Sequence, residues 1–95
     1  DRLDYPWSHI NIAMLLVDMG RNAEAVNAAL RALEVLPDDA WAHAMLGQAH
    51  LGLGEYEEAL VSLRKAAELN PAEMRIHELL KEAEAAISAS RGANE

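Results

Sequence analysis

The chain contains two copies of one 34-residue unit, and this internal repeat constrains its fold more than any other feature. Shifting the sequence by 34 positions aligns three kinds of uncommon residue, as the pairs Trp7 and Trp41, Gly20 and Gly54, and Pro37 and Pro71. A chance match in an alanine-rich chain would align alanines rather than tryptophan, glycine and proline together. Because one such unit cannot bury its apolar face alone, we expect the two copies to stack side by side.

Each unit is predicted to form two antiparallel helices. The expected ranges are 7–19 and 23–35 in the first unit, and 40–53 and 56–69 in the second. Gly20 and Gly54 are expected to end the first helix of each unit, because glycine adopts the left-handed conformation at no steric cost. Pro37 and Pro71 are each expected in the opening turn of the helix that follows them. Asn70 and Glu73 are expected to cap the amides of the helix that follows Pro71.

A third segment starts like a further unit but lacks a second helix. Its apolar residues follow helical spacing, at Ile76, Leu79, Leu80, Ala83 and Ile87. We therefore predict one all-α domain over residues 1–95, with about five helices. Repeat 1 covers about 6–39, repeat 2 about 40–73 and a capping helix about 72–90, and the tail at 91–95 is expected to fray.

Composition excludes several classes of function. The formal net charge is −8, which repels phosphate backbones and argues against a nucleic-acid partner. The chain has no cysteine, so disulfides and thiol chemistry are excluded, and this fits the cytosol and the periplasm alike, with the cytoplasm favoured. No apolar run is long enough to cross a membrane, and no basic amphipathic face suits a lipid surface. No catalytic motif is present, so we expect neither an enzyme nor a cofactor.

Two kinds of repeated side chain are candidate functional residues. Trp7 and Trp41 either anchor a partner or pack against the neighbouring helix pair, and packing is the favoured interpretation. His9, His43 and His77 recur in successive units. Equivalent atoms of stacked helices lie ~8–10 Å apart, too far for one zinc ion. We therefore predict no metal site and interpret the histidines as packing or hydrogen-bonding residues.

The spacing and residue types of the unit resemble the tetratricopeptide repeat family. The second unit carries the resemblance best, through Leu46, Gly47, Ala49, Gly54, Tyr56, Ala59, Leu63, Ala66 and Pro71. The first unit is looser, since Ala13 replaces the glycine, Asn22 the tyrosine and Ala29 a large residue. The aromatic residue usual near the start of the first helix is displaced, since His9 and His43 occupy that position.

The resemblance implies a right-handed α-solenoid whose first helices line a concave groove for a peptide or a helix of another protein. Carried onto this chain, the groove residues are Trp7, Ile10, Met14, Val17, Asp18, Trp41, Ala44, Gln48, Leu51 and Gly52, with Arg75, Glu78 and Glu82 from the capping helix. Some relatives clamp a C-terminal carboxylate with Lys, Asn and Arg in these places. Ile10, Met14, Ala44 and Gln48 stand there instead, so a partner with an acidic C-terminal tail is not expected.

The first helix is apolar on nearly every side, which is unusual for a helix at the end of an array. A preceding repeat, a second copy or the ligand itself would have to cover its outer face. The chain starts at Asp1, which favours a piece excised from a larger protein.

We therefore expect a non-catalytic module that binds a neutral or basic segment of a partner protein in its groove. The alternatives are an assembly domain that forms a homodimer through its first helix, or a structural fragment of a larger multidomain protein.

Overall fold

The computed structural model describes the backbone of residues 6–93 and the side chains of residues 9–92. Over this part of the chain the fold consists of helices with no strand, so the predicted all-α class is confirmed. The helices are α1 (Pro6–Asp18), α2 (Asn22–Val35), α3 (Ala40–Gly52), α4 (Tyr56–Leu69) and α5 (Met74–Ala93). The bounds of the first four agree with the predicted ranges to within one residue.

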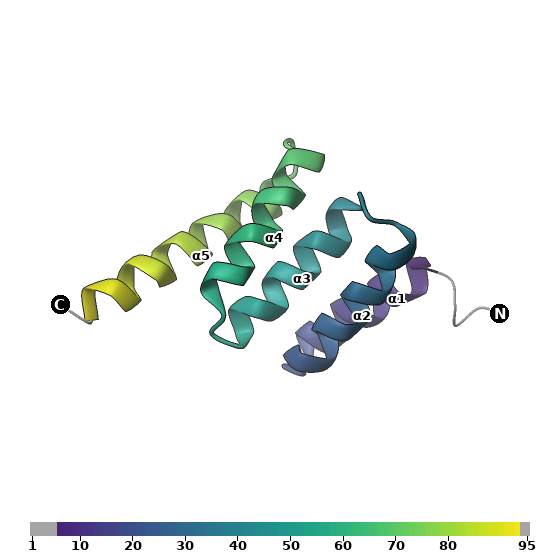
Figure 1. Cartoon of the computed structure of the whole chain (residues 1–95), viewed down its shortest axis with the longest axis horizontal. Coiled ribbons are helices and arrows are strands. Elements are labelled where there is room, and N and C mark those ends of the chain that lie inside the picture. Colours follow the sequence, from purple (N-terminus) through teal and green to yellow (C-terminus); the bar gives the residue numbers. More distant parts are fainter. Residues whose placement is uncertain (1–5, 94–95) are drawn as a thin grey trace.

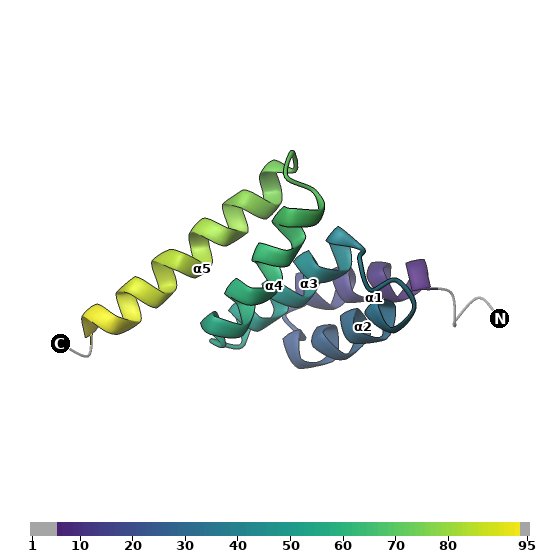
Figure 2. The ribbon, with the colours of Figure 1, turned by 45° about the horizontal axis from the view of Figure 1, so that its top comes forward.

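The helices form two layers, as Figures 1 and 2 show. Each pair of consecutive helices packs together, and α3 also contacts both α1 and α5. Within the described residues, α2 and α4 do not contact each other. Because helices touch within the layer of α1, α3 and α5 but not within the layer of α2 and α4, the array curves towards the first layer. That side of the molecule is therefore the concave one.

Small residues let the two layers approach closely. The buried face of α2 consists of alanines, at Ala25, Ala28, Ala29 and Ala32. Helices α3 and α4 approach closely at Gly47, where an added Cβ would lie 2.5 Å from Leu63 Cγ and 3.2 Å from the Ala59 carbonyl oxygen. Leu63, Ile76 and Leu79 are the largest fully buried side chains. The core therefore combines a few large side chains with many alanines.

The glycines behave as the sequence predicts, whereas the prolines do not. Gly20 and Gly54, the second residues after the ends of α1 and α3, adopt positive φ angles of 78° and 77°. Pro37 and Pro71 were predicted in the opening turn of a helix, and this is wrong, because α3 and α5 begin three residues later.

The residues that cap α3 and α5 also differ from the prediction, because these helices begin later than expected. Asp39 accepts a hydrogen bond from the Ala42 amide at 3.0 Å, and Glu73 accepts one from the Arg75 amide at 3.2 Å. Asp39 and Glu73 are equivalent positions of the repeat, so the same position provides a side-chain acceptor twice, to the amide three residues on in α3 and two residues on in α5. Asn70 instead ends α4, where its backbone amide donates to the Ala66 carbonyl.

Replacing Asp39 with alanine is expected to lower the free energy of unfolding by about 1 kcal/mol, since the first turn of α3 loses its side-chain acceptor. Urea denaturation followed by circular dichroism measures the change. Asp38 is an exposed neighbour in the preceding turn, and Asp38→Ala serves as the matched control. Equal losses in the two variants would contradict the capping role of Asp39.

The last helix starts later and ends later than predicted. It was expected at about 72–90 and runs from Met74 to Ala93, so residues 91–93 of the expected frayed tail are helical. The other tail residues lie outside the described part of the chain. Among the described residues, no helix combines the length and apolar character that crossing a bilayer requires.

Candidate partner-binding groove

The predicted groove residues of α1 occupy three kinds of environment. Met14 and Asp18 are exposed, and Val17 is half-buried. Ile10 is 5% exposed and belongs to a core cluster with Ala32 of α2 and Ala42 of α3, so it has little surface to offer a partner. The side chain of Trp7 lies outside the described residues. Among the described candidate groove residues of α1, Met14, Val17 and Asp18 therefore offer surface for contact.

On α3, an aromatic side chain and an amide remain accessible. Trp41 is 36% exposed, and Gln48 and Leu51 are half-buried. Ala44 is fully buried in the cluster that also contains Met45 and Leu46. Trp41 is thus accessible near the start of α3 and Leu51 near its end.

The capping helix contributes charge rather than apolar surface to this layer. Arg75, Glu78 and Glu82 are all exposed on α5. The Arg75 guanidinium lies 3.8 Å from the Glu78 carboxylate, one helical turn away. The charges of Arg75 and Glu78 cancel each other. Because Glu82 adds a further negative charge, these three residues together carry a net negative charge.

Two of the repeated histidines hold the loops between repeats. The His43 Nε2 atom lies 2.8 Å from the Pro37 carbonyl oxygen, and the His77 Nε2 atom lies 2.6 Å from that of Pro71. A carbonyl oxygen only accepts, so Nε2 carries the proton in each histidine and donates it. In each of the two loops, a histidine therefore donates to the carbonyl of the proline six residues before it. The sequence signal was the recurrence of both residues at the same spacing.

His50, which is not one of the repeated histidines, has a different partner. His50 Nδ1 lies 2.7 Å from the Glu55 carboxylate, across the turn between α3 and α4. Within the part of the chain that the structure describes, no three His, Asp or Glu side chains come close enough together to hold a metal ion. The hydrogen-bonding interpretation is confirmed for His43 and His77.

The layered helix pairs and the curved inner layer define a helical-repeat protein of the solenoid class. The family model described as tetratricopeptide repeat matches residues 10–74, so the chain belongs to the tetratricopeptide repeat family. Repeats of this family are generally non-catalytic protein–protein interaction modules.

One solved structure shows the same fold over nearly the whole chain. It is the NMR structure of the first TPR domain of the human RPAP3 protein, with a TM-score of 0.86 and 21% sequence identity. The match covers 92% of this chain and 68% of that chain. No curated protein matches the sequence.

Proposed function

We propose that the chain binds a neutral or basic segment of a partner protein in the groove lined by α1, α3 and α5, without catalysing a reaction. The observation that carries the proposal is the apolar surface left open on α1 and α3. Met14 is 41% exposed and Trp41 is 36% exposed, and half-buried Val17 and Leu51 lie on the same two helices. Covering such side chains supplies binding energy of about 25 cal/mol per Å² of apolar area.

The charge of the groove selects among partners. Asp18 on α1 and Glu82 on α5 are exposed, and the exposed cation Arg75 lies near Glu78. The chain as a whole carries a formal net charge of −8. This distribution favours a segment with Lys or Arg beside its apolar residues and speeds its encounter with the groove at low salt. Ile10, Met14, Ala44 and Gln48 provide no cation for an acidic C-terminal tail.

Panning a phage-displayed peptide library against the chain tests the preferred chemistry. We expect enriched peptides to combine large apolar residues with Lys or Arg, and their binding to weaken as salt rises. Enrichment of acidic peptides would contradict the proposed charge preference.

Met14→Glu is expected to weaken the binding of an enriched peptide at least tenfold, or about 1.4 kcal/mol, because a carboxylate replaces apolar contact surface. Isothermal titration calorimetry measures the affinity, and circular dichroism checks that helicity persists. Met74→Glu is the matched control, because Met74 is 74% exposed at the start of α5 and is not one of the groove residues. Unchanged affinity in the Met14 variant would count against this groove.

A further inference from the structure

One side of α1 is exposed where the corresponding side of α3 is buried. Ile12 is 39% exposed, whereas its repeat equivalent Leu46 is 8% exposed and shares a core cluster with Ala28 of α2. Leu15 is 60% exposed, whereas its equivalent Ala49 is fully buried. The preceding helix pair packs on α3, but within the described residues no helix pair precedes α1. This side of α1 is therefore an uncovered surface.

The uncovered side of α1 is an apolar stripe. Its members follow the i, i+3, i+4, i+7 spacing of one helix face, and we call them the α1 stripe: Ile12, Leu15, Leu16 and Met19. Leu16 is half-buried and the other three are exposed. By the same periodicity, the candidate groove residues Met14 and Val17 lie on the other side of α1. The α1 stripe is therefore a surface separate from the groove.

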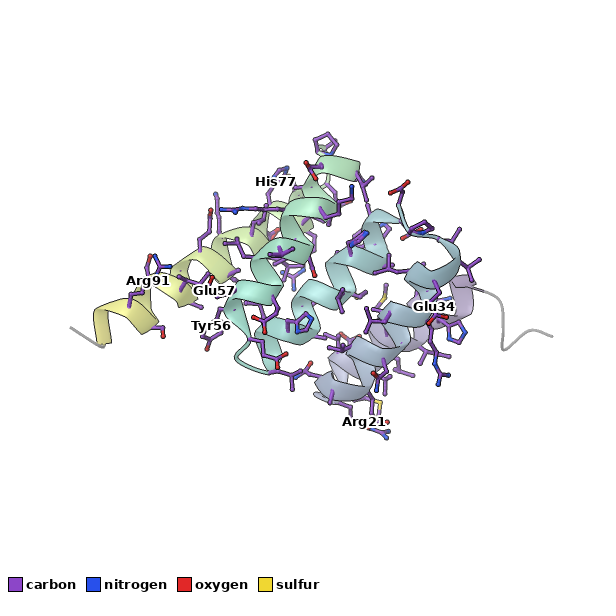
Figure 3. All side chains as sticks on the ribbon, viewed as in Figure 1. Arg21, Glu34, Tyr56, Glu57, His77 and Arg91 are labelled. Atoms are coloured by element: carbon purple, nitrogen blue, oxygen red, sulfur yellow. The ribbon has the colours of Figure 1, made fainter. Side chains whose placement is uncertain are left out.

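Charged side chains form a row along the neighbouring helix. The row runs along α2 and the residue before it, all four members are exposed, and we call them the α2 row: Arg21, Glu24, Arg31 and Glu34. Figure 3 shows Arg21 and Glu34 towards opposite ends of α2. An open cleft lies between the two helices, lined by Ile12 and Leu16 from the α1 stripe and by Glu24, Arg31 and Glu34 from the α2 row. The stripe and the row together form one surface, which we call the outer face.

The order of charges in the α2 row is self-complementary. The signs alternate from Arg21 to Glu34, and the charges lie symmetrically about the midpoint between Asn27 and Ala28. When two such rows run antiparallel about this midpoint, Arg21 of each copy faces Glu34 of the other. In the same alignment, Glu24 of each copy faces Arg31 of the other. Every charge of the row thus meets an opposite charge, whereas two parallel rows in register would bring like charges together.

The α1 stripe suits the same arrangement. A two-fold axis that crosses α1 and α2 at right angles places α1 opposite α1 and α2 opposite α2, each pair antiparallel. The stripe is apolar along its whole length, so in either register its side chains meet apolar side chains of the other copy. One symmetry operation therefore satisfies both halves of the outer face.

We propose that two copies of the chain form an isologous dimer through the outer face, with the α1 stripes packed together and the α2 rows paired in antiparallel order. Burial of the stripe supplies the affinity, and the row fixes the orientation. The charge balance favours this face for the contact. The chain carries a formal net charge of −8, whereas the two positive and two negative charges of the α2 row cancel. Two copies therefore approach each other here with less repulsion than the charge of the whole chain would cause.

The size of the outer face indicates a weak dimer. Helix α2 has 14 residues and is therefore about 21 Å long, and two helices side by side are about 20 Å wide. Two such faces bury roughly 800–1,000 Å² in total, at the low end for a specific interface. We expect dissociation in the micromolar to millimolar range of concentration rather than a permanent dimer.

Sedimentation equilibrium of the 95-residue chain from micromolar to millimolar concentration tests the proposal. We expect the average mass to rise with concentration to twice the mass of one chain and to stop there, because an isologous contact uses the same face of both copies. Leu15→Glu is expected to weaken the dimer at least tenfold, since it places a carboxylate in the apolar contact. Val61→Glu is the control, because Val61 is a strongly exposed residue of α4 outside the outer face.

Charge reversal in the α2 row tests the antiparallel order. Glu24→Arg and Arg31→Glu each bring like charges together twice in a two-fold dimer, so each is expected to weaken self-association at least tenfold. An equimolar mixture of the two variants pairs opposite charges again and is expected to form a 1:1 dimer. The double variant with both reversals in one chain is expected to dimerise within about threefold of the wild type, or about 0.6 kcal/mol. Circular dichroism verifies that each variant keeps its helicity.

Three results would overturn the proposal. A wild-type chain that stays monomeric at every concentration would leave the outer face to a different protein. Growth beyond the dimer would indicate a contact through two different surfaces. Failure of both the mixture and the double variant to restore dimers that the single reversals prevent would show that Glu24 and Arg31 do not face each other across the axis.

Discussion

Truncating Leu63 to alanine is expected to lower the free energy of unfolding by about 3 kcal/mol. Leu63 is one of the largest fully buried side chains and packs with Ala59, Leu79 and Ala83 at the junction of α4 and α5. Removing its branched end leaves a cavity among neighbours on three helices, because the side chain also abuts Gly47 of α3. Urea denaturation followed by circular dichroism measures the loss.

Val61→Ala is the matched control for Leu63→Ala. Val61 lies on the same helix but is strongly exposed, so its truncation is expected to change stability by no more than about 0.5 kcal/mol. A loss of similar size in both variants would contradict the central place of Leu63 in the core.

Adding one methyl group at Gly47 is expected to cost about 2 kcal/mol, although alanine favours a helix more than glycine does. The new Cβ would lie 2.5 Å from Leu63 Cγ, well inside van der Waals contact, so α3 and α4 must separate or Leu63 must move. Gly92→Ala is the control, because nothing lies within 4 Å of a Cβ added there. Thermal denaturation of both variants separates crowding from helix propensity.

The two core substitutions are expected to be coupled. In Gly47→Ala combined with Leu63→Ala, the truncated leucine no longer occupies the space that the new methyl group needs. The double variant should therefore lose less stability than the sum of the two single variants, by about 1 kcal/mol. Strict additivity would show that the cost at Gly47 arises from the Ala59 carbonyl oxygen rather than from Leu63.

Most of the fold could be predicted from the sequence because the repeat supplies the same information twice. Gly20 and Gly54 fix the ends of the first helices, and apolar spacing identifies the helices themselves. The prediction that Pro37 and Pro71 lie in the opening turn of a helix was wrong, because proline suits both a helix start and the turn before it. The helices begin directly after Asp39 and Glu73, whose carboxylates accept hydrogen bonds from amides in the first turns of α3 and α5.

The candidate groove could be predicted less completely. The family resemblance predicts Ile10 and Ala44 as groove residues, but it does not show how much of their surface a neighbouring helix covers. Tertiary packing buries both, Ile10 against Ala32 and Ala42, and Ala44 beside Met45 and Leu46. The apolar character of α1 did signal an uncovered surface, since Ile12 and Leu15 are exposed whereas their repeat equivalents Leu46 and Ala49 are buried.

The contacts of α3 have a mechanical consequence. In the described part of the chain, α3 contacts all four other helices, whereas neither α1 nor α2 contacts α4 or α5. Within the described residues, α3 is thus the helix that connects the first helix pair to α4 and α5. The orientation of the first helix pair relative to α4 and α5 therefore depends on how each of them packs against α3.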